Sequence, residues 1–146
     1  MGDNPVRTLK IAIFVVVVLP IAAIWLAFLV PFLRPIPTLA AGIYSGASNE
    51  RAAGDELTER LFQRFPVGTP AIALTEHLKG ENWGPVMVNH VSKNEPPQLF
   101  VRFKRPVNPF TVEVTTVIWQ SDQDGRLVGV RGGYFRDAMF KQGGWS

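Results

Sequence analysis

Residues 11–33 read IAIFVVVVLPIAAIWLAFLVPFL, a run of 23 residues without a charged, amide or hydroxyl side chain. As one helix this segment is about 34 Å long, at about 1.5 Å per residue, which exceeds the ~30 Å hydrocarbon core of a bilayer. Sixteen of its residues are Leu, Ile, Val or Phe, and each favours insertion by roughly 0.3–0.6 kcal/mol near the centre of a helix. The sequence therefore predicts one N-terminal transmembrane helix over residues 11–33.

The competing interpretation of this segment is a cleaved secretory signal, because residues 39–42 read Leu-Ala-Ala-Gly and offer the small residues of a cleavage site. The apolar run is longer than the usual 7–15 residues of such signals, which favours a retained anchor. Pro20 removes a backbone donor and should kink the helix. Ala23 and Ala27 form a small-xxx-small pair, on which we expect another membrane helix to pack, although alanine is also common in lipid-facing positions.

The charges beside the apolar segment predict its orientation. Arg7 and Lys10 precede it closely, whereas Arg34 is followed by no further base until Arg51. The positive-inside bias then makes residues 1–10 a cytoplasmic tail. We therefore expect a single-pass protein of the bacterial inner membrane, with its C-terminal domain in the periplasm.

Composition narrows the class of protein. The 146-residue chain has a net charge of +3. From Thr38 onward it contains 12 basic and 11 acidic residues, so we do not expect a basic surface that binds nucleic acid. The chain contains no cysteine, which excludes disulfides, thiolate nucleophiles, zinc–thiolate sites and a lipidated cysteine within it.

Two helices are predicted after a Pro- and Gly-containing linker over residues 34–47, whose prolines favour an extended spacer. The first begins after Ser48 as the capping residue and repeats apolar side chains every four positions. The second begins at Thr69 and Pro70 and ends at Gly80. The predicted apolar positions are Ala53, Leu57, Leu61, Phe62 and Phe65 in the first helix and Ile72, Leu74 and Leu78 in the second. A tight turn between them predicts an antiparallel pair.

From Gly84 the apolar period changes to two, which is typical of strands. Three strands are predicted over residues 86–91, 99–104 and 110–119, and a fourth, weakened by glycines, over 126–134 after a turn at 121–125. Residues 135–141 form one helical turn or a frayed end. The order of elements predicts a two-layer α+β domain over residues 48–146, with two helices packed on a three- to four-stranded antiparallel sheet.

The polar residues of the sequence form no convincing catalytic or metal site. His77 and His90 lack a second ligand at metal spacing, and Asp122–Gly125 resembles a calcium loop that turn chemistry explains. Glu113 is a strand carboxylate without an evident partner. Arg102, Lys104 and Arg105 form a basic cluster, most simply a solvent-facing sheet edge. We therefore predict a protein that is not an enzyme, without catalytic residues, metal ions or cofactors.

A family resemblance is carried by residues 61–70, LFQRFPVGTP, followed by Leu74, Leu78 and Trp83, and by the later turn at residues 124–127, DGRL. These segments resemble the helix–turn–helix opening and the closing hairpin of the small BamE-like (SmpA/OmlA) envelope domains, over roughly residues 50–130. The resemblance implies an envelope protein that binds other proteins and has no catalytic centre. Classical members carry a lipidated cysteine, whereas this chain has an apolar N-terminal segment in its place.

These observations favour an accessory, scaffold or assembly subunit of a larger membrane complex, whose partners are other membrane subunits and the lipid bilayer. The alternative is a membrane-tethered sensor with a ligand pocket between helices and sheet. A third, an unrecognised enzyme, would require polar residues from several elements to converge in one cleft. Five large side chains near the C-terminus form the predicted partner interface: Tyr134, Phe135, Met139, Phe140 and Trp145. The alternative is that this segment folds back across the open face of the sheet.

Overall fold

The computed structural model describes residues 14–43, 49–90, 97–108 and 110–138. The chain divides into two compact units, Met1–Arg34 and Pro35–Ser146.

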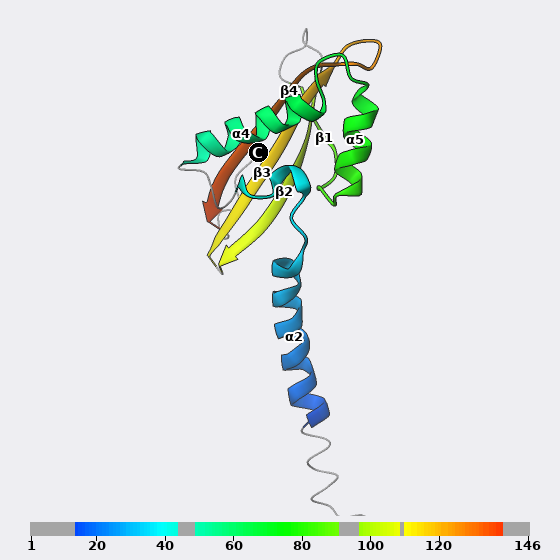
Figure 1. Cartoon of the computed structure of the whole chain (residues 1–146). Helices are drawn as coiled ribbons and strands as arrows, with labels where there is room; N and C mark the ends of the chain where they lie inside the picture. The colour runs from blue at the N-terminus through cyan, green and yellow to red at the C-terminus, as the bar shows by residue number, and fades with distance from the viewer. Residues whose placement is uncertain (1–13, 44–48, 91–96, 109, 139–146) are drawn as a thin grey trace, which may run out of the picture. The chain divides into compact units, whose positions relative to one another are not determined.

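The first unit is helical where it is described, but the helix type changes along it. A π-helix η1 covers Phe14–Val18, the α-helix α2 covers Leu19–Leu29, and a 3₁₀-helix η2 covers Val30–Leu33 (Figure 1). Within the described residues, none of the helices combines the length and apolarity needed to cross a bilayer. The prediction of a transmembrane helix over residues 11–33 is therefore wrong for this structure, since the 11 residues of α2 extend only about 16 Å at about 1.5 Å per residue.

The second unit contains one antiparallel sheet in the order β1-β2-β3-β4. The strands are β1 (Met87–Asn89), β2 (Gln98–Asn108), β3 (Thr111–Ser121) and β4 (Leu127–Ala138). The predicted four-stranded meander is thus present. The expected helical turn after Tyr134 is wrong up to Ala138, because β4 pairs with β3 along its whole length and Ala138 lies opposite Thr111.

Helix α4 covers Glu50–Arg64 and begins one residue later than expected. The side chain of Asn49 accepts a hydrogen bond of 2.8 Å from the backbone N–H of Ala52, so Asn49 is the capping residue, and Ser48 lies outside the described residues. Ala53, Leu57, Leu61 and Phe65 are buried at their predicted four-residue spacing. Phe62 does not share that face and is exposed.

Helix α5 covers Ala71–Gly80, and Pro70 occupies the N-cap position predicted for Thr69, without a capping hydrogen bond from its side chain. Leu74 and Leu78 are buried as expected, whereas Ile72 is 61 % exposed. Figure 1 shows that α4 and α5 splay apart instead of forming an antiparallel pair, with α4 over β4 and α5 on the side of β1 and β2.

The space between the splayed helices is occupied by the segment that precedes them. The 3₁₀-helix η3 covers Thr38–Ala40, and Leu39, Ala40 and Ile43 are all at least 96 % buried. Arg60 of α4 donates hydrogen bonds to the carbonyl groups of Leu39 and Ala41. Part of the expected spacer, residues 34–47, is therefore built into the core of the second unit.

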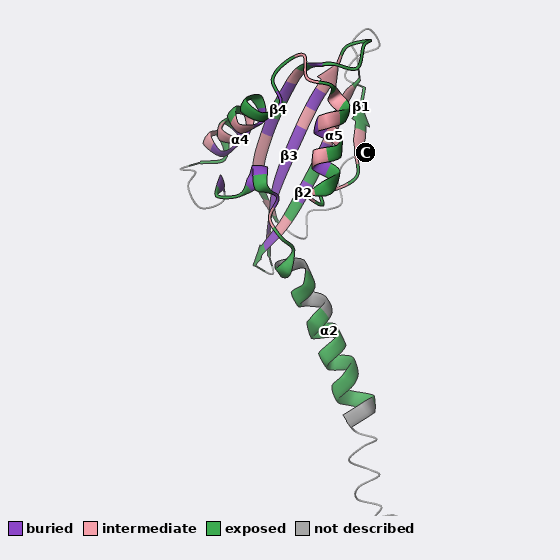
Figure 2. Ribbon diagram, turned by 45° about the vertical axis from the view of Figure 1, so that its right-hand side comes forward, coloured by how far each residue is buried: buried purple, intermediate pink, exposed green. Residues whose placement is uncertain are grey.

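One face of the sheet packs against both helices and η3 to form the core. Val101 and Phe103 of β2, and Val117 and Trp119 of β3, belong to this cluster together with the buried helix residues. Figure 2 shows that β3 is buried along most of its length. Helix α4 approaches β4 most closely at Gly132, where an added Cβ would lie 2.5 Å from Cγ of the buried Leu57. A glycine at this position allows the helix to contact the edge strand directly.

The outer edge of β4 is covered by groups from several parts of the chain. The turn before α5 forms backbone hydrogen bonds with Leu127, since Gly68 donates to its carbonyl and its own N–H donates to Thr69. Further along, the N–H of Gly132 donates to Oγ1 of Thr58 at 2.9 Å. Such pairing protects this edge from adding another strand.

Candidate functional site

The most developed polar cluster of the described residues lies where β3 and β4 face the N-terminal end of α4. Glu113 of β3 is 3 % exposed, and its Oε1 accepts three hydrogen bonds from β4. These come from the Tyr134 hydroxyl at 2.8 Å, from Arg136 Nε at 3.2 Å and from Arg136 Nη2 at 3.1 Å. Glu50 of α4 accepts from the backbone N–H of Arg136 at 2.9 Å. The cluster therefore joins two strands and a helix.

This arrangement corrects the expectation that Glu113 has no evident partner. The signal lies in the sequence distance across the hairpin, because residues 113 and 136, which are 8 positions before and 11 positions after the turn at 121–125, lie directly opposite each other in the register. Cross-strand pairs of opposite charge stabilise antiparallel sheets. Short sequence motifs do not contain that distance, so they do not reveal the pair.

The electrostatics of the cluster suit a fixed link better than proton transfer. Burial, followed by the hydrogen bond to Glu113, raises the pKa of Tyr134 to about 12, so the hydroxyl stays protonated at neutral pH. The hydrogen bonds to Tyr134 and Glu113 raise the pKa of Arg136 further above its ordinary value. A general acid or base works best with a pKa near the operating pH. Neither Tyr134 nor Arg136 meets that condition.

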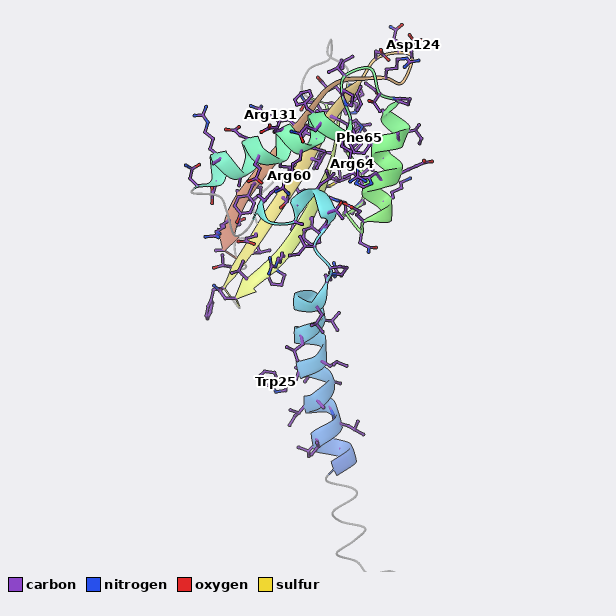
Figure 3. All side chains as sticks on the ribbon, viewed as in Figure 1. Trp25, Arg60, Arg64, Phe65, Asp124 and Arg131 are labelled. Carbon is purple, nitrogen blue, oxygen red and sulfur yellow. The ribbon has the colours of Figure 1, made fainter. Side chains whose placement is uncertain are left out.

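An open hollow of about 340 Å³ lies beside this cluster, between α4 and β4. Its lining mixes both signs of charge, with Arg51 and Arg131 near Glu50 and Asp55, and its floor is formed by glycines. Figure 3 labels Arg131 on β4, above the ribbon of α4. Small-molecule sites are usually enclosed and mostly apolar. This hollow is open and is lined by charges of both signs, so it does not resemble such a site.

A second polar cluster attaches η3 to the end of α5. Glu81 accepts a short hydrogen bond from the Thr38 hydroxyl and one from Trp83 Nε1 at 3.5 Å, and its Oε1 lies 3.5 Å from Nε2 of His77. Burial alone would raise the pKa of Glu81, but the hydrogen bond from Thr38 and the charge of His77 outweigh it, so the pKa lies below 4.5. This carboxylate fixes the start of the domain to α5.

The other sequence candidates have structural roles where they are described. Oδ1 of Asp122 accepts from the N–H groups of Asp124 at 3.0 Å and Arg126 at 2.8 Å, so this segment is a turn, as its composition indicated. No group of three metal-ligating side chains is found in the parts of the chain that the structure describes. His90 is exposed.

The predicted interface residues are divided by the structure. Tyr134 turns inward to Glu113, whereas Phe135 is 38 % exposed on the opposite face of the sheet. Met139, Phe140 and Trp145 lie outside the described residues. Arg102 and Lys104, from the predicted basic cluster, are exposed.

Helix α2 has the largest exposed apolar surface of the first unit. Trp25 is 67 % exposed and is seen projecting from the ribbon in Figure 3. Exposed apolar residues occur at nearly every described position of the helix, so it has no polar face: Leu19, Ile21, Ile24, Trp25, Leu26 and Leu29. Ala23 and Ala27, the predicted helix-contact pair, both lie within α2.

No family model, curated protein or solved structure matches this chain. The resemblance to BamE-like envelope domains therefore stays a prediction from the sequence.

Proposed function

We propose that this protein is a non-enzymatic accessory or assembly subunit of a larger membrane-associated complex in the bacterial envelope. The observation that carries the proposal is the uniformly apolar surface of α2, on which Trp25, Ile24 and Leu26 are each more than half exposed. A helix that is hydrophobic on all sides is stable only when it is buried. We infer that other subunits of the complex cover it, with Ala23 and Ala27 as the positions of closest helix approach.

The second unit supports a role in binding over one in catalysis. Among the described residues, its best polar cluster joins Glu113 to Tyr134 and Arg136 as a link between two strands. The space between helices and sheet, where a sensor would hold its ligand, is filled by Leu39, Ala40 and Ile43. The alternative of a tethered ligand-binding domain is therefore the weaker proposal.

We propose that this domain lies on the periplasmic side, as the resemblance to envelope domains implies.

Gentle-detergent purification followed by mass spectrometry of the copurifying proteins tests the proposal. We expect other subunits in stoichiometric amounts with the natural chain, and their loss from an Ile24→Ser, Trp25→Ser variant. Val67→Ser is the matched control, because Val67 is 60 % exposed in the turn before α5. Recovery of the natural chain only as a free monomer, across several gentle detergents, would contradict the proposal.

The periplasmic location has a separate test. The chain contains no cysteine, so Asp124→Cys in the exposed hairpin turn introduces a single thiol. We expect a membrane-impermeant thiol reagent to label it in intact spheroplasts. Labelling only after lysis would overturn the location without affecting the assembly role.

A further inference from the structure

The two faces of the sheet differ in what covers them. Side chains alternate between the faces of a strand, and Val117 and Trp119 of β3 belong to the core with the helices and η3. Ile118 therefore points to the other face, which we call the second face. Figures 1 and 2 show α4 and α5 on the opposite side of the sheet. Ile118 is only half-buried, so this part of the second face is accessible.

The strand register gives the second face an uneven charge. Phe100 of β2 and Arg131 of β4 both lie opposite Ile118, and directly opposed residues of neighbouring strands share a face. Arg102 follows Phe100 by two positions and is on the same face. Among the described strand residues, the charged side chains of this face are Arg102, Lys104, Arg131 and Asp137. Asp137 lies at the far end of β4, so the surroundings of Ile118 are basic.

An open hollow of about 230 Å³ lies on this part of the second face. Its lining includes Gln98, Ile118, Gln120, Gly129 and Arg131, and we call it the Ile118 hollow. Gly129 lies opposite Gln120, and an added Cβ there would meet nothing within 4 Å. The hollow therefore exists where β4 lacks a side chain, with Ile118 as its apolar part and an arginine and two amides around it.

Two arginines are available to a ligand in the Ile118 hollow. Arg102 and Arg131 are exposed, and neither forms an ion pair with any residue that the structure describes. The Arg102 guanidinium lies 5.0 Å from the centre of the Phe100 ring, and this cation–π contact keeps it beside the hollow. Strands β2 and β4 are about 10 Å apart, at about 4.8 Å between neighbouring strands, so both arginine side chains can reach one group between them. A guanidinium binds a carboxylate through two parallel hydrogen bonds.

The size of the Ile118 hollow indicates a single side chain and not a whole small molecule. Pockets for small molecules usually measure about 300–1,000 Å³ and are enclosed, whereas this hollow is smaller and open. The Gln98 amide can both donate and accept a hydrogen bond, which suits the backbone of a peptide beside that side chain. A second copy of the chain that docked face to face would oppose like charges.

We propose that the Ile118 hollow is the docking site for a glutamate or aspartate side chain on an exposed segment of another subunit. The carboxylate lies between Arg102 and Arg131, and its methylene stem packs on Ile118. The inference rests on the proposed assembly role, because the partner belongs to the same complex, but the contact is on the sheet and not on α2.

Carbodiimide coupling in the gently purified complex tests this docking, because it joins an amine to a carboxylate that contacts it. Arg131→Lys places an amine at the hollow and keeps the positive charge. Arg64→Lys is the matched control, since Arg64 is exposed at the end of α4 and forms no ion pair with a described residue. We expect an amide between residue 131 and an acidic side chain of a copurifying subunit, identified by mass spectrometry, and no such amide from residue 64.

Three results of this experiment would overturn the proposal. Coupling of residue 131 to an acidic residue of the chain itself would assign the hollow to a second copy or to an internal contact. Equal coupling from residues 131 and 64, or none from residue 131 while subunits are present, would remove the docking. Anionic lipid that copurifies with the natural chain, but not with an Arg102→Gln, Arg131→Gln chain, would assign the hollow to a lipid headgroup.

A second measurement does not need the other subunits. A fluorescent peptide that alternates Glu and Leu should bind the detergent-solubilised full chain about tenfold more tightly than the same peptide with Gln in place of Glu, because charge-assisted contacts replace neutral ones. Arg102→Gln, Arg131→Gln should abolish this difference. Arg51→Gln, Arg64→Gln, which removes the same charge from α4, should keep it.

Equal binding of the two peptides, or the same loss in both double variants, would contradict the docking. The Ile24→Ser, Trp25→Ser chain should bind the Glu peptide as the natural chain does, so failure of the assembly role and failure of the docking are distinguishable. If no subunit copurifies, which contradicts the assembly role, the peptide measurement decides the docking by itself.

Discussion

Replacement of Gly132 by alanine tests the contact that joins α4 to the edge of the sheet. The new Cβ would lie 2.5 Å from Cγ and 2.7 Å from Cβ of Leu57, whereas carbon atoms in contact prefer about 3.5–4.0 Å. Leu57 is fully buried and its clashing atoms are close to the backbone, so a rotamer change cannot relieve the overlap. Overpacking of this kind costs about 1–3 kcal/mol. We expect a loss near the upper end, about 2–3 kcal/mol, because a shifted strand would also strain the bond from Gly132 to Thr58.

Urea and thermal unfolding followed by circular dichroism measure this loss. Gly129→Ala is the matched control, since its added Cβ meets nothing within 4 Å on the same strand. The control should change stability by less than about 1 kcal/mol, in the stabilising direction, because alanine restricts the unfolded chain more than glycine does. A Gly132→Ala protein as stable as the Gly129→Ala protein would refute the reasoning.

The double variant Gly132→Ala, Leu57→Ala separates the steric clash from other effects of the substitution. Leu57→Ala alone should cost about 2–5 kcal/mol through the cavity that it leaves. Leu57→Ala removes the contacts of the new methyl group with Cγ and Cδ2 but keeps the contact of 2.7 Å with Cβ. The loss of stability in the double variant should therefore be smaller than the sum of the two single losses by about 1 kcal/mol. Strict additivity would show that the clash is not the cause.

Two further predictions concern pH. The folded-state pKa of Tyr134 is about 12 against an unfolded value of 10.0, so its contribution to stability is complete below pH 10 and is lost as the pH rises towards 12. Tyr134→Phe should remove the late-titrating tyrosine from an absorbance titration. A natural chain whose two tyrosines both titrate near pH 10 would contradict this prediction. The pKa of Glu81 lies below 4.5 in the fold, so its contribution to stability is present above pH 4.5 and is lost as the pH falls through the lower folded value. Thr38→Ala removes a hydrogen bond to that carboxylate and should therefore reduce the free energy of unfolding more at pH 7 than at pH about 3. Equal reductions at the two pH values would contradict the assignment.

The parts of the fold that the sequence predicts are those governed by local periodicity. Leu57 and Leu61 recur at helical spacing, and the alternation around Val117 marks a strand, so elements and their buried faces follow from the pattern. Ile72 is exposed, contrary to the prediction, because helix α5 is short and its buried side chains are Leu74 and Leu78.

Features that depend on distant contacts were not predictable in the same way. The burial of Leu39 and Ile43 depends on the gap between two splayed helices, and their own segment has the composition of a linker. The link between Glu113 and Arg136 depends on strand register, which a motif search does not consider. The length of the apolar segment predicted one continuous helix, whereas its described residues change helix type beside Pro31, which lacks a backbone donor.

The central claim is that other subunits cover α2, and photo-crosslinking from that helix tests it most directly. A photoreactive residue in place of Trp25, whose side chain is 67 % exposed, should give a crosslinked product of higher mass that contains a second protein, identified by mass spectrometry. The same residue in place of Asp124, in the exposed hairpin turn of the other unit, is the control. We expect a protein crosslink from position 25 that is absent or different at position 124. Recovery of only uncrosslinked chain from position 25, or identical products from both positions, would contradict it.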